Sequence, residues 1–180
     1  MKKSLKISFL ILTLFLAGCL GSKQDPDEVL AIVRGTEITL GEVTFLYGED
    51  NIWDGLRLLM AIELTKQEVE ELNLDISTEW ENNKDSIRDL PPKEEARGDE
   101  IDYWEFSEKQ GKLLNMEPNE FFLEYIEQTM KNLSYFITYM VETVGHYDDM
   151  SEDEFNRLIN DEVNRLMDVY DDEIEIFYKL

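Results

Sequence analysis

The chain has 180 residues with 41 acidic and 17 basic side chains, so its formal net charge at pH 7 is −24. A surface with this excess of negative charge repels phosphate backbones, which excludes nucleic-acid binding through a basic patch. The residues are nevertheless 43% hydrophobic and 11% aromatic, which is too apolar for a disordered acidic tail. The length suits one domain with a core of its own.

The N-terminal segment has the three parts of a secretory signal, which are a basic, an apolar and a small-residue region. Three lysines precede an apolar run over residues 7–16, and Leu-Ala-Gly stands directly before Cys19. The run is shorter than the roughly 20 apolar residues that cross a bilayer. We therefore expect residues 1–18 to be a signal peptide.

The sequence Leu-Ala-Gly-Cys at residues 16–19 resembles the lipobox of bacterial lipoproteins. The resemblance implies cleavage before Cys19 and a diacylglyceryl group on its thiol, and two acyl chains attach a protein stably to a lipid bilayer. The alternatives are an ordinary signal peptide with an incidental cysteine, or a catalytic thiol, which needs a base and an electropositive setting. We expect a polar tether over residues 19–28, a single domain over residues 29–180, and a location on the extracytoplasmic face of the cell membrane.

The N-terminal half of the expected domain begins with a β-prone segment and continues with helices. Residues 29–38 are rich in Val and Ile and contain a glycine turn, which predicts one short strand or a hairpin. The next motif, Thr-Leu-Gly-Glu at residues 39–42, fits a capping box and predicts a short helix. A second helix is expected over residues 51–72, and a third begins with Ser77 or Thr78 as its cap.

The second half begins with a loop over residues 89–100, which contains two prolines, a glycine and many charges. A helix is expected over about residues 102–115. A longer one over residues 118–144 has a proline in its first turn and apolar side chains every three or four positions. A capping box at Ser151 predicts the start of a final helix. The apolar face that follows it continues almost to Leu180. The expected fold class is mostly α, with about five to six helices and one short N-terminal β strand or hairpin.

No combination of side chains in the sequence indicates catalysis. The single cysteine belongs to the lipobox, and the single histidine, His146, lies at a predicted helix end, where the helix dipole favours a protonated imidazole. The acidic residues around Asp148 and Glu152 lack the spacing of a calcium-binding loop, so we interpret them as a solvated loop before a helix. A nucleophile, a base and oxyanion donors are not grouped anywhere in the pattern. We expect no enzymatic activity, no metal site and no cofactor.

Three motifs follow one another within residues 29–81. Residues 31–39 read Ala-Ile-Val-Arg-Gly-Thr-Glu-Ile-Thr, residues 67–69 read Gln-Glu-Val, and residues 73–77 read Asn-Leu-Asp-Ile-Ser. In this order they resemble the start of the SurA-type N-terminal chaperone domain, which PrsA-type foldase lipoproteins share. Arg34 stands where the family usually has Asn. The parvulin-type prolyl isomerase module that these families often carry has no counterpart in the sequence.

The resemblance implies a non-catalytic helical domain that holds unfolded segments of exported proteins or assists their folding. Aromatic and Met side chains make adaptable apolar contacts. We therefore expect weak client contacts from five residues of the longest helix, Phe121, Tyr125, Met130, Tyr139 and Met140. The alternative for each of them is a place in the core, as in most apolar helix stripes. The alternative for the whole chain is a lipoprotein that binds one dedicated partner, such as an immunity protein or an envelope-complex subunit.

Overall fold

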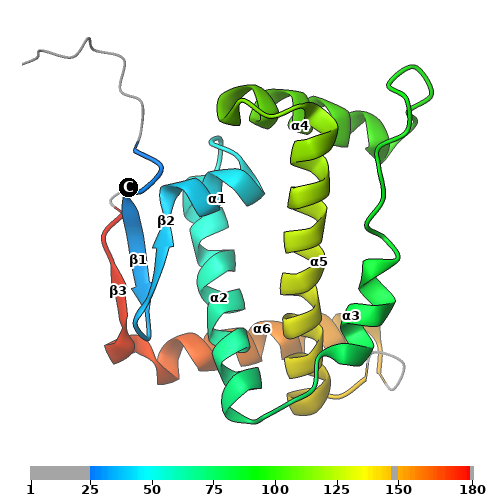
Figure 1. Cartoon of the computed structure of the whole chain (residues 1–180). Coiled ribbons are helices and arrows are strands. Elements are labelled where there is room, and N and C mark those ends of the chain that lie inside the picture. The colour runs from blue at the N-terminus through cyan, green and yellow to red at the C-terminus, as the bar shows by residue number, and fades with distance from the viewer. Residues whose placement is uncertain (1–24, 147–149, 179–180) are drawn as a thin grey trace, which may run out of the picture.

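The computed structural model describes residues 25–146 and 150–178. Six α-helices, one short 3₁₀ turn and a small antiparallel sheet make up this part of the chain (Figure 1). The mostly α fold class with a short β hairpin is confirmed. Cys19 and the expected signal peptide lie outside the described residues, and so does most of the expected tether.

The domain starts with a hairpin of two strands, β1 (Val29–Val33) and β2 (Thr36–Thr39). A two-residue turn joins them, and its residues Arg34 and Gly35 have φ angles of 47° and 88°. Positive φ at both central positions matches the right-handed twist of the flanking strands. The hairpin is therefore built from the turn that the sequence indicates, with arginine in a backbone conformation that usually favours glycine or asparagine.

The capping box at the end of the hairpin is confirmed. The Thr39 hydroxyl accepts a hydrogen bond from the Glu42 backbone N–H, and the Glu42 carboxylate accepts one of 2.7 Å from the Thr39 N–H. Two backbone donors that the first helical turn leaves unpaired are thereby satisfied. Helix α1 (Leu40–Tyr47) follows at once and ends at Gly48.

Five further helices follow α1. They are α2 (Ile52–Glu71), α3 (Ser77–Lys84), α4 (Asp99–Leu114), α5 (Pro118–Thr143) and α6 (Glu152–Val169). Figure 1 shows α6 crossing the end of the bundle where it meets α2 and α5, while α4 lies across the opposite end of α5. Within the described residues, no helix has the length and apolar character to span a bilayer.

Helix α3 begins one or two residues before the expected position and has a different cap. The N-cap is Ile76, and neither Ser77 nor Thr78 holds that position. The Asp75 carboxylate instead accepts a hydrogen bond of 2.9 Å from the Ser77 N–H. Hydrogen bonds from the Ser77 hydroxyl and N–H lower the pKa of Asp75, because they stabilise the ionised carboxylate.

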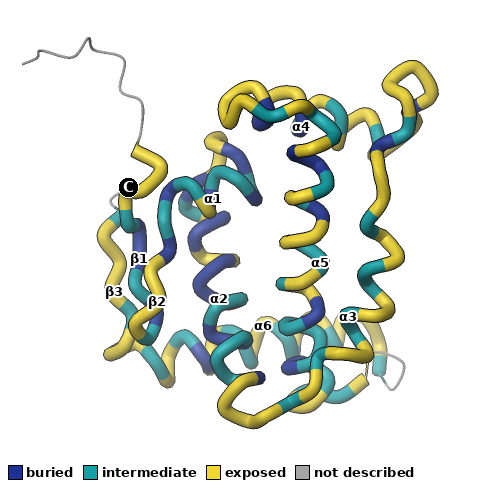
Figure 2. The backbone as a smooth tube through the Cα atoms, in the orientation of Figure 1, coloured by how far each residue is buried: buried dark blue, intermediate teal, exposed yellow. Residues whose placement is uncertain are grey.

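The main core lies between the sheet, α1, α2 and the C-terminal parts of α5 and α6 (Figure 2). Helix α2 supplies much of it, since Leu56, Met60 and Leu64 are at most 1% exposed. Burial of one such side chain stabilises a fold by about 1.5–3 kcal/mol. This core holds the hairpin against α2.

A smaller apolar cluster lies at the N-terminal end of α5. Leu90, Phe122 and Ile126 are buried there, and Trp104 of α4 packs against them. The Trp104 indole N–H donates a hydrogen bond of 2.9 Å to the carbonyl of Pro91. These contacts fasten the segment between α3 and α4 onto the bundle, although its composition is that of a loop.

The C-terminal segment differs from the sequence-based expectation of one helix running almost to Leu180. Helix α6 ends at Val169, and β3 (Ile174–Ile176) pairs antiparallel with β1, which gives the strand order β2-β1-β3. Alternating apolar residues at Ile174 and Ile176 fit a strand, whose side chains repeat every two residues, but they also continue the apolar face of α6. Hydrogen bonding to the free edge of β1 favours the strand over a continuation of helix α6.

Candidate functional site

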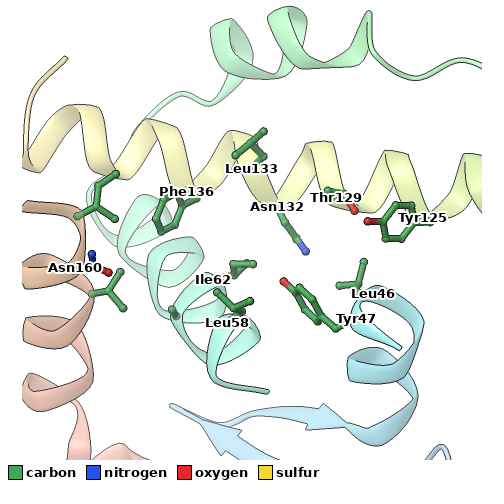
Figure 3. Close-up of a pocket in the computed structure, with 13 residues that line it drawn as sticks. Leu46, Tyr47, Leu58, Ile62, Tyr125, Thr129, Asn132, Leu133, Phe136 and Asn160 are labelled. Carbon is green, nitrogen blue, oxygen red and sulfur yellow. The ribbon is translucent and has the colours of Figure 1, made fainter. Parts of the chain in front are cut away.

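A largely apolar pocket of about 370 Å³ lies between α1, α2, α5 and α6 (Figure 3). Its lining contains no Asp, Glu, Lys or Arg side chain. Two of its leucines stay well exposed, Leu58 at 52% and Leu133 at 37%. Exposed apolar side chains around a concave apolar surface indicate a binding site. The lining residues are Leu46, Tyr47, Leu58, Ala61, Ile62, Tyr125, Thr129, Asn132, Leu133, Phe136, Ile159, Asn160 and Val163.

Two polar groups face this pocket from opposite sides, the Tyr47 hydroxyl on α1 and the Asn132 amide on α5 (Figure 3). Neither forms a hydrogen bond with another residue that the structure describes. Burial, and secondarily the neighbouring Tyr125, raises the pKa of Tyr47, so its hydroxyl remains protonated at neutral pH. An amide both donates and accepts hydrogen bonds. The pocket therefore offers polar groups of the kind that pair with a peptide backbone.

The wall formed by α1 and α2 depends on a close approach at Gly55. A Cβ atom at this position would lie 2.9 Å from the Cβ of Tyr47 and 3.0 Å from a methyl group of Val43. Contacts this short do not occur between carbon atoms in folded proteins, so only glycine lets α2 pack so closely on α1. The glycine thus fixes where the ring of Tyr47 enters the pocket.

The wall formed by α5 and α6 is held by a polar cluster next to the core. The buried Tyr139 on α5 donates a hydrogen bond of 2.6 Å from its hydroxyl to the Glu162 carboxylate on α6. Arg165 donates to the same carboxylate at 2.7 Å and to the Tyr139 oxygen at 3.1 Å. Burial and the hydrogen bond to Glu162 raise the pKa of Tyr139, so its hydroxyl stays a donor.

The five residues expected to contact clients occupy different places. Phe121, Tyr139 and Met140 are at most 1% exposed and belong to the core, which leaves them no surface for a client. Met130 is half-buried and packs against the smaller cluster of Leu90, Phe122 and Ile126. Tyr125 alone of the five lines the pocket.

Sequence reasoning missed most of the pocket. Leu58 and Leu133 lie in the predicted helices, but exposure of a leucine is decided by which faces of two helices meet, and periodicity does not give this. Asn132 and Asn160 are polar residues on amphipathic helices and resemble ordinary surface positions. Nothing in the sequence distinguishes Asn132 from other polar residues at the border of an apolar stripe, although the structure places it in the pocket.

A polar cluster surrounds Arg34 in the turn between β1 and β2, and its residues do not line the pocket. Its guanidinium donates to Glu71, lies within 3.7 Å of carboxylate oxygens of Glu68 and Glu173, and stacks 4.1 Å from the ring centre of Tyr170. The cluster joins the hairpin turn to the ends of α2 and α6. We interpret it as structural, because the arginine is already engaged by three carboxylates.

Metal ligands are not gathered anywhere in the described part of the chain, since no three His, Cys, Asp or Glu side chains there are placed to hold an ion. A comparison with models of known protein families finds no match. Neither a curated protein nor a solved structure matches the chain significantly.

Proposed function

We propose that this protein is a membrane-anchored lipoprotein on the extracytoplasmic face, whose helical domain holds unfolded segments of exported proteins. The observation that carries the proposal is the apolar pocket between α1, α2, α5 and α6, with Leu58 and Leu133 exposed at its border. An unfolded chain presents apolar side chains together with unpaired backbone amides and carbonyls. The pocket offers apolar surface for the former and the groups of Tyr47 and Asn132 for the latter.

The order of elements supports the same proposal. The SurA-type and PrsA-type resemblance implies a hairpin or strand, a short helix, a longer helix and a C-terminal helix that returns to the start of the domain. Here β1, β2, α1 and α2 follow in that order, and α6 with β3 returns to β1. The membrane anchor rests on the lipobox-like sequence ending at Cys19, and it would give the pocket a high effective concentration where exported chains emerge.

Suppression of aggregation tests the holding activity. Residues 20–180 are mixed with three unrelated unfolded proteins as these are diluted from denaturant, and light scattering is followed. We expect less scattering in all three cases. Leu58→Asp places a charge at the pocket border and should abolish the effect. Leu113→Asp is the matched control, because Leu113 of α4 is 56% exposed, against 52% for Leu58, and does not line the pocket.

Two outcomes would contradict the proposal. One is failure to reduce the aggregation of any of the three proteins. The other is equal activity of Leu58→Asp and the unchanged chain. Stoichiometric crosslinking to one protein in intact cells, with no effect on unfolded proteins, would instead favour the dedicated-partner alternative.

A further inference from the structure

The apolar pocket is the middle of a longer groove. A second hollow of about 340 Å³ adjoins it and shares Leu58, Ala61, Asn160 and Val163 with it. A third hollow of about 100 Å³ adjoins the other side and shares Ile62 and Asn132. Because neighbouring hollows have lining residues in common, the three follow one another across the surface of α2. The groove therefore has a central apolar part and two different ends.

The two ends differ in charge. The end between α2 and α6 is lined by one acidic and one basic residue, Asp54 and Arg57. The end next to β2 is lined by three glutamates and one lysine, which are Glu37, Glu42, Glu63 and Lys66. Lys66 is already paired with Glu63 at 3.0 Å. The excess of negative charge at this end therefore comes from Glu37 and Glu42.

Glu37 is the carboxylate most available to a ligand. The Glu42 carboxylate accepts hydrogen bonds from the backbone N–H and the hydroxyl of Thr39. Glu37 is exposed on β2 and forms no ion pair with any residue in the described ranges. A hollow of about 100 Å³ has the volume of roughly three water molecules, which suits one side chain and excludes a turn of helix.

We propose that the groove binds an extended peptide segment with an apolar stretch in its central part and a lysine or arginine side chain in the acidic hollow beside β2. This inference rests on the proposed function and adds the chemistry of the segment. Among the described residues, the strand order β2-β1-β3 leaves one side of β2 unpaired, and Thr36, Glu37 and Ile38 of that strand line the acidic hollow. An unpaired strand edge at this place favours an extended ligand over a helical one.

Three labelled peptides test the proposal on the lipidated full-length protein in phospholipid nanodiscs. All three have the same central Leu-Val-Ala-Leu sequence. They differ in their two flanks, which consist of Lys in one peptide, Ser in the second and Glu in the third. We expect the Lys-flanked peptide to bind about tenfold more tightly than the Glu-flanked one, because the exposed acidic hollow attracts the first peptide and repels the second. The preference should shrink at high salt, because these charges are exposed to solvent.

Glu37→Lys should remove or reverse the preference while the Ser-flanked peptide still binds. Glu105→Lys is the matched control, because it makes the same change of charge on an exposed residue of α4 that lines none of the three hollows. Equal affinities of all three peptides for the unchanged protein would overturn this inference and leave the proposed holding function intact. An absence of binding by every peptide would overturn both. An unchanged preference in Glu37→Lys would also overturn the inference.

Discussion

The hydroxyl of Tyr139 on α5 and the carboxylate of Glu162 on α6 are joined by a hydrogen bond of 2.6 Å at the edge of the core. This bond, with Arg165 on its outer side, fixes one wall of the pocket. Because Tyr139 is only 1% exposed, its hydroxyl is shielded from water, and its hydrogen-bond partners are Glu162 and Arg165. The bond is therefore a suitable place to test how α5 and α6 are held together.

Tyr139→Phe removes this hydroxyl and keeps the ring. We expect the free energy of unfolding to fall by about 1.5 kcal/mol, the lower value for a hydrogen bond to a charged group, because Glu162 keeps its bond from Arg165. Urea unfolding followed by circular dichroism measures the change. Tyr103→Phe is the control, since the Tyr103 hydroxyl makes no hydrogen bond within the described residues. Equal losses in the two variants would contradict the interpretation.

The same carboxylate makes stability depend on acidic pH. The hydrogen bond from Arg165, and a further one from Tyr139, lowers the pKa of Glu162 below its unfolded value. A lowered pKa contributes stability that is present above the unfolded pKa, near 4.3, and is lost as the pH falls through the folded pKa. We expect Arg165→Met to lose less stability between pH 7 and pH 3 than the unchanged protein. Arg157→Met, which removes an exposed pair with Asp161, is the control.

Arg34→Asn tests the cluster at the hairpin turn. Asparagine tolerates the φ of 47° at this position, so the variant reports the loss of the guanidinium and not a backbone change. The Arg34 side chain is 15% exposed and its removal leaves Glu68, Glu71 and Glu173 without their shared cation. We expect a loss of about 2–4 kcal/mol in urea unfolding.

The control for Arg34 is Arg157→Asn. Arg157 and Asp161 form a pair in which both side chains are about 60% exposed, at 60% and 62%. Pairs of this kind contribute less than about 1 kcal/mol because water screens them. A loss of similar size in the two variants would show that the Arg34 cluster is no more than a surface ion pair.

Gly55→Ala tests the wall between α1 and α2. Alanine favours a helix over glycine by about 1 kcal/mol, but its Cβ would lie 2.9 Å from the Cβ of Tyr47. We expect the clash to outweigh the helix preference and to destabilise the protein by about 1–3 kcal/mol. Binding of the Ser-flanked peptide should weaken too, since Tyr47 must shift. Asn82→Ala, on an exposed part of α3, gives the helix effect without a clash.

Cys19→Ser tests the lipid anchor. We expect the variant to incorporate no labelled palmitate, because the chain has no other thiol. The protein should then be missing from the acylated membrane proteins. Metabolic labelling followed by gel electrophoresis measures this. Ser22→Ala in the expected tether is the control and should label normally. Incorporation of palmitate into Cys19→Ser would contradict the lipobox interpretation.

Local signals in the sequence predicted most of the fold. The capping box at Thr39 and the proline at Pro118 act through neighbouring residues only, so helix starts there follow from sequence. The strand at Ile174–Ile176 differs from the expected helix because it forms by pairing with β1, which lies more than a hundred residues away in the chain. A contact between distant segments leaves no local pattern to read.

The candidate site was predicted less well than the fold. The side chains expected to contact clients are bulky residues of α5, and three of them, Phe121, Tyr139 and Met140, are buried, as large apolar side chains usually are. The pocket is formed instead by residues at the border of the apolar stripe, such as Leu133 and Asn132. Whether a border of this apolar stripe is covered by a neighbouring helix depends on how α5 and α6 cross. The crossing is a tertiary contact, which the local sequence does not determine.

The pairing of β1 with β3 affects how the protein folds during its synthesis. The hairpin is synthesised first and β3 last. The edge of β1 that pairs with β3 therefore stays unpaired while more than a hundred residues are added. At about 5–20 residues per second this interval lasts roughly seven to thirty seconds. During that time β1 carries a bare edge that invites wrong pairing. A protein proposed to shelter unfinished chains thus passes through a vulnerable unfinished state of its own.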